Sequence, residues 1–143
     1  MNVKAAKAFG KGVEFICRYR AVGSFIRRYG AYAVEGDKLD AYVEATLKDD
    51  ERGDPLITAE GLEVLGIMSK DQYRYIEKST QDITALISEL LEGKGLELYD
   101  IKLEFGLDKY NDIMLIDEIS SGNMRVYKGE NVIEPMDLSD LLF

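Results

Sequence analysis

Histidine is absent from this chain of 143 residues, and cysteine and proline are scarce, with one and two copies. Without histidine, a Ser-His-Asp triad, a Cys-His dyad and a histidine-containing zinc site are all excluded within the chain. The single cysteine, Cys17, has no second cysteine with which to form an internal disulfide or a CxxC zinc pair. Catalysis by these residues must therefore rest on carboxylates, lysine, arginine, backbone amides or a bound cation.

Long hydrophobic runs and an excess of positive charge are also missing. No apolar stretch reaches transmembrane length, and the first residues, MNVKAAKAFGKG, lack the pattern of a signal peptide. The formal net charge of −9 argues against general nucleic-acid binding, which needs a basic surface. We therefore expect a cytoplasmic protein that binds neither nucleic acid nor a membrane.

The composition that remains is typical of a globular protein, with 46% hydrophobic and 31% charged residues. A chain of this length corresponds to one domain and can bury a sizeable core without disulfides. Residues 1–12 are basic and rich in glycine and alanine, so we expect them to lead into a single domain over residues 13–143.

Alternation of apolar and polar residues predicts several strands. The predicted strands span residues 13–21, 39–48, 96–107, 113–119 and 124–127. On the first of them, Phe15 and Cys17 fall on one face, and Glu14 and Arg18 fall on the other.

The strongest helix signal covers residues 69–92. Ser69 and Gln72 form an S-x-x-Q capping box, and Gly93 and Gly95 end the pattern. The expected core-facing stripe of this helix consists of Tyr73, Ile76, Thr80, Ile83, Ile87 and Leu90. Shorter helices are expected over residues 24–30 and 58–65, and a last helical turn over 137–143. Together these elements predict an α+β fold, with a mostly antiparallel sheet packed against one long helix.

The expected hairpin DIKLEFGLDKYNDIMLIDE is the first candidate for chemistry. Asp100, Lys102 and Glu104 share a face of its first strand, and a turn centred near residues 110–111 would place Asp117 opposite Glu104. Opposed carboxylates repel each other unless a cation lies between them, and a histidine-free oxygen site suits Mg²⁺ completed by substrate phosphates. A solvated acidic face, with the register off by one, accounts for the pattern equally well.

A compact basic cluster follows the first strand. The strand carries Arg18 and Arg20 on one face, and the chain then turns into a short helix that we expect Ser24 to cap and that contains Arg27 and Arg28. Helix N-termini and arginines both attract phosphate. We favour phosphate binding for Arg18 and Ser24, and ordinary surface positions for Arg27 and Arg28.

Two further segments carry weaker signals. Residues 48–55, KDDERGDP, have the composition of a solvated charged loop. Residues 117–125, DEISSGNMR, are typical of a hairpin turn, although a carboxylate, a glycine and an arginine in this order could also line the edge of a pocket.

These four segments, in this order, resemble the motifs of the phosphoribosylaminoimidazole-succinocarboxamide synthase (SAICAR synthetase) family. VEFICRYRAVGSF resembles the family pattern V-E-x-x-x-R-x-x-A-x-G-S, and TLKDDERGDPL resembles the loop L-K-x-D-x-x-x-D-P. LYDIKLEFGL resembles the strand D-x-K-L-E-F-G, and LIDEISSGNMRVY resembles D-E-I-S-P-D-x-x-R-x-W. The resemblance covers residues 13–127, and four motifs in order are specific where each alone is weak.

The resemblance implies the central domain of the SAICAR synthetase-like fold and an ATP-dependent ligase of de novo purine biosynthesis. Such an enzyme joins carboxyaminoimidazole ribonucleotide to L-aspartate, uses ATP and Mg²⁺, and often forms dimers. Carried over by position, the resemblance implies that the 5′-phosphate binds to Arg18, Ser24 and Arg125. It further implies catalytic roles for Lys48, Asp54 and Lys102, a pocket-lining role for Asp100, and binding of ATP and magnesium by Glu104 and Asp117.

The sequence departs from the family pattern in several places. Gly53 stands where the family commonly has histidine, Ser121-Gly122 replaces Pro-Asp, and Tyr127 replaces tryptophan. The family's N-terminal ATP-binding lobe should precede Val13, where we expect only the lead-in segment.

Two functions are therefore open at this point. The chain belongs to an active ligase, or it is a non-catalytic nucleotide- or phosphate-binding module or an inactive fragment of that ligase. A plain structural domain would leave the ordered polar motifs unexplained. We also expect the isolated chain to self-associate through the surface that the lobe would cover.

Overall fold

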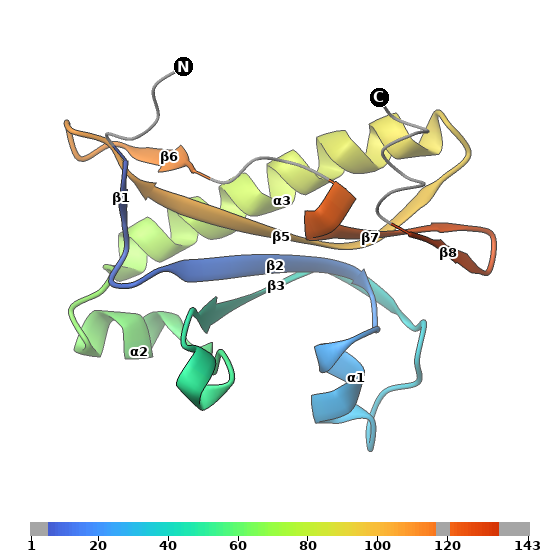
Figure 1. Cartoon of the computed structure of the whole chain (residues 1–143), viewed down its shortest axis with the longest axis horizontal. Helices are drawn as coiled ribbons and strands as arrows, with labels where there is room; N and C mark the ends of the chain where they lie inside the picture. The colour runs from blue at the N-terminus through green and yellow to red at the C-terminus, as the bar shows by residue number, and fades with distance from the viewer. Residues whose placement is uncertain (1–5, 117–120, 135–143) are drawn as a thin grey trace.

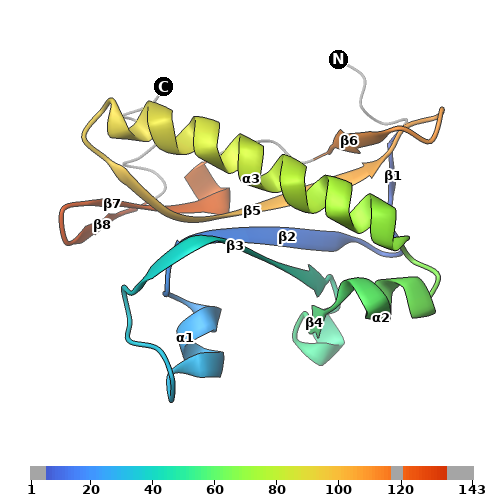
Figure 2. The ribbon, with the colours of Figure 1, turned by 180° about the vertical axis from the view of Figure 1, so that it is seen from behind.

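A computed structural model describes residues 6–116 and 121–134 of the chain. An antiparallel sheet forms the body of the molecule, and the helix α3 (Lys70–Glu92) crosses one of its faces (Figures 1 and 2). The expected α+β fold, with a mostly antiparallel sheet against one long helix, is confirmed.

The sheet runs in the order β4-β3-β2-β5-β7-β8, and each strand is antiparallel to its neighbours in this order. Its central strands are β2 (Val13–Arg20) and β5 (Glu97–Leu107), which pair Glu14 with Glu104 and Arg18 with Asp100. The other strands on this path are β3 (Lys38–Leu47), β4 (Leu56–Ile57), β7 (Met124–Lys128) and β8 (Asn131–Ile133). The sequence therefore located the longer strands to within about one residue but did not predict β4 or β8.

Two short strands pair with β5 away from that path. β1 (Lys7–Ala8) pairs with Leu107 and Gly106, so part of the expected lead-in joins the sheet. β6 (Ile113–Leu115) closes a hairpin with the end of β5, and residues 117–119 of the longer expected strand lie outside the described residues.

The ends of α3 follow the predicted signals. Ser69 Oγ accepts from Gln72 N at 3.1 Å, and Gln72 Oε1 accepts from Ser69 N at 2.9 Å, which completes the capping box. The buried stripe agrees with the prediction at Tyr73, Ile76 and Thr80 and differs toward the C-terminal end of the helix. Thr84 and Leu91 are buried there, Ile83 and Ile87 are only partly buried, and Leu90 is 69% exposed. Leu91 lies about five turns of 3.6 residues beyond Tyr73 and so returns to the same side of the helix.

The part of the chain that the structure describes also contains four short helices. They are α1 (Ser24–Tyr29), η1 (Asp50–Arg52), α2 (Ala59–Val64) and η2 (Ser121–Asn123). Thr58 caps α2 as expected, by accepting from Gly61 N at 2.9 Å. The expected cap of α1 is wrong, because Gly23 occupies the N-cap position and Ser24 is already the first helical residue. The helical turn expected over 137–143 lies outside the described residues.

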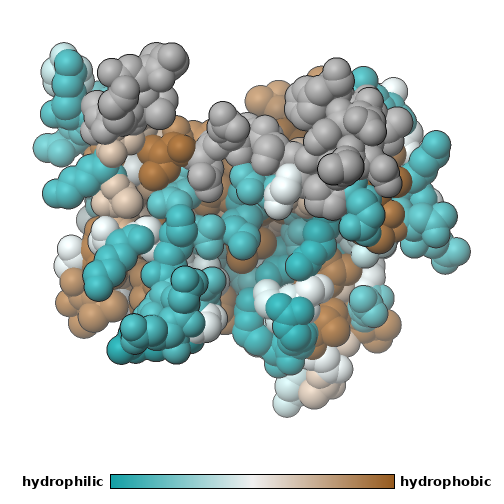
Figure 3. Space-filling model, viewed as in Figure 1, coloured by the Kyte–Doolittle hydropathy of each residue, from teal (hydrophilic) through white to brown (hydrophobic). Residues whose placement is uncertain are grey.

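The hydrophobic core lies between the sheet and α3. Phe15 from β2 and Leu103 from β5 are fully buried there, together with Ile76 of α3. Because side chains alternate along a strand, Glu14 and Arg18 point to the opposite face of the sheet. Hydrophilic side chains gather over that face, which we call the polar face (Figure 3). Among the described residues, no helix combines the length and apolar character needed to cross a membrane.

Candidate functional site

A cavity of about 660 Å³ opens on the polar face, between α1, the loop that follows η1 and the segment leading into β7. Most of the residues proposed from the sequence line it. They are Arg18, Ser24, Asp54, Asp100, Lys102 and Arg125. Lys48 and Glu104 pair with each other beside the cavity, and Asp117 lies outside the described residues.

Arg18 is the centre of the cavity wall and is only 2% exposed. Its Nε and Nη2 donate to Glu44 at 3.1 and 2.8 Å, and its Nη1 donates to Asp100 at 3.0 Å. Nη1 also donates to the Val22 carbonyl at 3.1 Å, and Nη2 donates to Ser24 Oγ at 2.7 Å. A guanidinium has five N–H donors, so these contacts occupy all of them within the protein. Arg18 therefore holds the wall of the cavity together.

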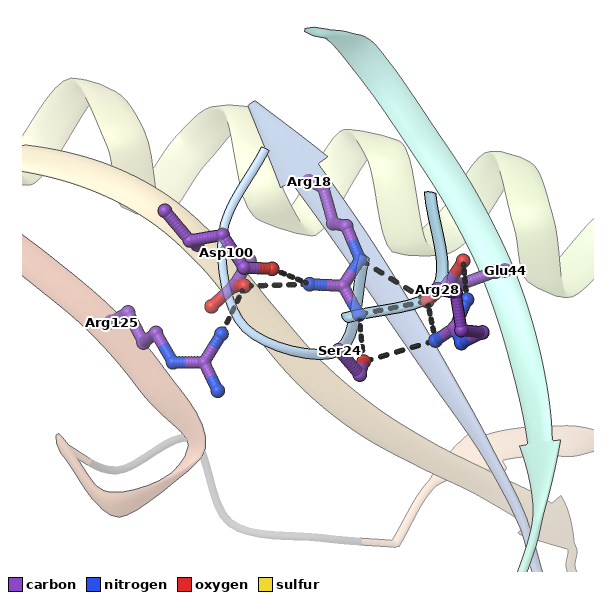
Figure 4. A network of polar contacts seen from close by, with 7 residues as sticks. Arg18, Ser24, Arg28, Glu44, Asp100 and Arg125 are labelled. Carbon is purple, nitrogen blue, oxygen red and sulfur yellow. Dashed lines mark hydrogen bonds and ion pairs between the residues drawn. The ribbon is translucent and has the colours of Figure 1, made fainter. Parts of the chain in front are cut away.

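The contacts of Arg18 extend on both sides into a chain of alternating charges (Figure 4). On one side Arg28 donates to Glu44 Oε2 and to Ser24 Oγ, each at 2.9 Å. On the other side Arg125 donates to Asp100 Oδ2 at 3.0 Å. We call this group, which consists of Arg18, Ser24, Arg28, Glu44, Asp100 and Arg125, the arginine end of the polar face.

The two carboxylates of the arginine end respond differently to their burial. Burial pushes the pKa of Glu44 upward, but hydrogen bonds from Arg28 and Arg18 outweigh it and leave the pKa below its ordinary value. Burial dominates at Asp100, whose pKa is raised although Arg125 and Arg18 oppose the rise. Glu44 is thus the more firmly ionised carboxylate of the pair.

A second group of charged side chains lies further along the central strands β2 and β5. Lys48 Nζ contacts Glu104 Oε1 at 2.9 Å, and Lys102 Nζ approaches Glu14 Oε1 at 3.9 Å. We call these four residues the lysine end. Glu14 and Arg18 are four residues apart on β2, which separates the two ends by roughly 13 Å along the strand.

Burial is the main cause that raises the pKa of Glu14, and Glu104 and Asp54 raise it further. Lys102 and Lys48 act in the opposite direction. The lysine end therefore contains a carboxylate whose charge is poorly stabilised until a cation or another donor approaches it.

Asp54 reaches the cavity from the loop after η1, with a φ of 49° that is unusual for a residue other than glycine. Its Oδ1 accepts from Asp49 N at 2.7 Å, and its own N donates to Asp49 O at 2.9 Å. This closed loop presents Asp54 opposite the strands that carry the other polar residues.

The expected pairing of Glu104 with Asp117 is wrong in register. Ile116 N donates to Glu104 O at 3.0 Å, and Phe105 pairs with Leu115, so Ile116 stands opposite Glu104. Within residues 6–116 and 121–134, no group of three or more His, Cys, Asp or Glu side chains is placed to hold a metal ion. The Mg²⁺ role of Glu104 stays a prediction, and a single carboxylate suits Mg²⁺ only where phosphates complete the shell.

Sequence reasoning missed two residues of the arginine end. Glu44 was overlooked because a glutamate on the outer face of a strand usually faces solvent, and only the pairing of β3 with β2 brings it to Arg18. Arg28 was assigned to the surface, yet its contacts with Glu44 and Ser24 place it in the wall of the cavity. The spacing of Ser24 and Arg28, one helical turn apart, was the available signal.

Comparison with known proteins agrees with these motifs and this geometry. The sequence model of the SAICAR synthetase family matches residues 1–138. The chain belongs to the SAICAR synthetase family. A phosphoribosylaminoimidazole-succinocarboxamide synthase of Clostridium tetani is 59% identical over 143 residues, covering 99% of this chain and 63% of that protein.

Solved structures extend the likeness to the fold. One SAICAR synthetase superposes with a TM-score of 0.81 at 41% identity, over 87% of this chain and 55% of that chain. A second, described as in complex with ADP, gives a TM-score of 0.79 at 34% identity, over 89% of this chain and 55% of that chain. The chain thus spans between half and two thirds of the length of these relatives.

Proposed function

We propose that this chain forms the substrate-binding part of an ATP-dependent ligase of purine biosynthesis. The reaction joins the carboxylate of carboxyaminoimidazole ribonucleotide to the amine of L-aspartate and converts ATP to ADP and phosphate. Membership of the SAICAR synthetase family supports the reaction class. The arginine end, with its chain of alternating charges on the wall of the cavity, is the observation that carries the proposal.

The arginine end is the proposed site of the ribonucleotide 5′-phosphate. It sets three arginines against two carboxylates, so its positive charge exceeds what the protein itself neutralises. The side chain of Arg125 is 45% exposed, and within residues 6–116 and 121–134 its guanidinium donates to Asp100 alone, with further N–H donors to spare. Arg125 is therefore the proposed direct contact of the phosphate, with Ser24 beside it. Arg18 and Asp100 hold this contact in place from beneath.

The lysine end and Asp54 are the proposed surroundings of the reacting groups. Lys102 and Asp54 line the cavity, and Lys48 is held against Glu104 just beyond it. Glu104, together with Asp117, would hold Mg²⁺ through carboxylate oxygens while ATP phosphates complete the shell. The bound cation would supply charge stabilisation for phosphoryl transfer. The lysines would orient anionic groups and offset developing charge, so the chain contributes positioning and electrostatics without a histidine base.

The proposed setting follows from the resemblance. We place the enzyme in the cytoplasm and expect it to act as a homo-oligomer. The part of the relatives that this chain does not span would contribute the remainder of the ATP site.

A coupled assay of ADP release tests the proposal. The chain is supplied with carboxyaminoimidazole ribonucleotide, aspartate and Mg-ATP, alone and together with the segment of the Clostridium tetani relative that it does not span. Turnover that disappears in Glu104→Ala supports the ligase. Absence of turnover in both mixtures, with no binding of the ribonucleotide by calorimetry, contradicts it.

The second candidate is a non-catalytic phosphate- or nucleotide-binding module. It is favoured by the arginine end, which lines the cavity and can bind a phosphate without any group that acts on ATP. Binding of the ribonucleotide without any release of ADP in either mixture would select this candidate.

A further inference from the structure

We infer that Gly23 is a positioning residue for Arg125. The missing side chain at Gly23 leaves the space in which the Arg125 guanidinium lies while it donates to Asp100. Gly23 would thus position Arg125, the last residue in the chain of alternating charges, although it carries no functional group of its own.

The guanidinium of Arg125 lies directly against the Cα atom of Gly23, in the space that a side chain would fill. A Cβ atom added to Gly23 would lie 2.0 Å from Nη1 of Arg125, 2.6 Å from its Cζ and 2.7 Å from its Nη2. Favourable contacts between such heavy atoms begin near 3.5 Å, so a methyl group and this guanidinium cannot occupy their places together. The atom that would be displaced first, Nη1, is the one that donates to Asp100 Oδ2 at 3.0 Å.

The backbone around Gly23 has little freedom to move aside. The neighbouring Val22 carbonyl accepts from Arg18 at 3.1 Å, and the Gly23 carbonyl accepts from Arg27 N at 3.1 Å. Two residues before Gly23, Ala21 is fully buried and exchanges two backbone hydrogen bonds with the loop at residues 36–37, each of 2.8 Å. The turn between β2 and α1 is therefore held at both ends.

The backbone of Arg125 is fixed as well, because it pairs with Asp100 across β5 and β7. The side chain of Arg125 is 45% exposed and flexible. An added methyl group at Gly23 is therefore expected to move the guanidinium away from Asp100 and leave the sheet intact. A displaced guanidinium in an intact sheet is the result expected of a positioning residue, whereas a purely structural residue would disturb the sheet itself.

Gly23 also has a φ of 62° and a ψ of −133°, a conformation that residues with a Cβ rarely adopt. Backbone strain alone would make alanine unfavourable at this position, whatever Arg125 does. Gly66 offers a matched control, because its φ is 72° and an added Cβ would meet no atom within 4 Å.

A double-mutant cycle distinguishes a clash with Arg125 from backbone strain at Gly23. Gly23→Ala and Gly66→Ala are each made in the original chain and in Arg125→Ala, and urea midpoints are measured for all variants. We expect Gly23→Ala to lower the midpoint less in the Arg125→Ala background than in the original chain, because the clash is then relieved. Gly66→Ala should give the same shift in both backgrounds. Equal shifts for Gly23→Ala in the two backgrounds would overturn the inference.

Titration with inorganic phosphate provides a readout that strain alone would not move. Gly23→Ala is expected to weaken phosphate binding by about tenfold, the equivalent of one charge-assisted hydrogen bond, while Gly66→Ala leaves it unchanged. Unchanged binding in Gly23→Ala would count against the positioning role. This titration rests on the proposed phosphate site, whereas the unfolding cycle does not. If the original chain binds no phosphate, the proposed function loses its phosphate site, and the cycle still decides the role of Gly23.

Discussion

The arginine end and the lysine end of the polar face hold their charges in different ways. At the arginine end the central cation, Arg18, is 2% exposed and gives every N–H donor to the protein. At the lysine end the side chains of Lys48 and Lys102 are 47% and 50% exposed, and their ion-pair distances are 2.9 and 3.9 Å.

The difference follows from the chemistry of the two cations. The planar guanidinium of arginine donates to several fixed acceptors at once, whereas a lysine ammonium is a flexible point charge. The arginine end is therefore preorganised, as the proposed binding of one compact anion requires. The lysine end can rearrange around groups that change charge during a reaction.

The largest expected effect is that of Arg18→Met. It leaves Glu44 and Asp100 buried without their shared cation, so the free energy of unfolding should fall by about 3–5 kcal/mol in urea denaturation. The control is Arg52→Met, because Arg52 is 70% exposed and pairs only on the surface, and it should change stability by less than about 0.5 kcal/mol. Similar losses in both variants would contradict a central role for Arg18.

Glu44→Gln and Glu14→Gln compare a buried strand carboxylate of the arginine end with a partly buried one of the lysine end. The lowered pKa of Glu44 means that its ionised form stabilises the fold at neutral pH, and this contribution is lost as the pH falls through the folded-state pKa. Glu44→Gln should therefore cost about 1.5–3 kcal/mol at pH 7, measured by urea denaturation, and less in acid.

The pKa of Glu14 is shifted in the opposite direction, so its contribution to stability depends on pH in the opposite way. Its raised pKa means that its contribution is present at low pH and is lost as the pH rises through the folded-state pKa. Glu14→Gln should therefore leave stability at pH 7 within about 0.5 kcal/mol of the original chain, or raise it slightly. A loss equal to that of Glu44→Gln would erase the contrast between the two ends.

Arg125→Ala should raise the pKa of Asp100 further, because Arg125 is the largest influence opposing the effect of burial at that carboxylate. The stability contribution of Asp100 would then be lost over a higher range as the pH increases. Carboxyl carbon shifts followed by NMR during a pH titration measure this directly. Glu44 is held by Arg18 and Arg28 and serves as the internal reference, so parallel shifts of both carboxylates would argue against separate contacts.

Lys48→Met is expected to change stability much less than Arg18→Met. Glu104 is buried, but the Lys48 side chain is half exposed and leaves the ion pair open to solvent, so its removal should cost about 1 kcal/mol, and the cost should shrink in high salt. Turnover in the coupled assay should nevertheless fall sharply. A stability loss as large as that of Glu44→Gln would show that the lysine end is not adaptable.

Patterns in the sequence predicted much of the fold because they are local. The capping box at Ser69 and Gln72 and the alternation along β2 need only neighbouring residues to be recognised. Leu90 was misassigned because the buried stripe on a long helix depends on which of two adjacent positions faces the sheet. Gly23 takes the cap of α1 because its backbone conformation excludes the residues that usually cap through a side chain.

The arginine end was predicted only in part, because its assembly depends on contacts between distant strands. Arg18, Ser24 and Arg125 lie in motifs that can be recognised from the sequence. Glu44 meets Arg18 from 26 residues away, and nothing in its own segment indicates that meeting.

The register of the hairpin was missed by one residue because its turn is closed by backbone and side-chain contacts. Asp108 N donates to Asp112 O at 2.9 Å, and Asp108 Oδ1 accepts from Tyr110 N at 2.8 Å. The five-residue loop is therefore centred on Tyr110, and this centring brings Ile116 opposite Glu104.

Calorimetric titration of the chain with carboxyaminoimidazole ribonucleotide, and with the same nucleoside lacking its 5′-phosphate, tests the central claim most directly. A preorganised arginine end predicts that the ribonucleotide binds at least about tenfold more tightly, and that Arg125→Ala removes most of this preference. Equal affinity for the two compounds, or a preference that persists in Arg125→Ala, would contradict the assignment of the arginine end as the phosphate site.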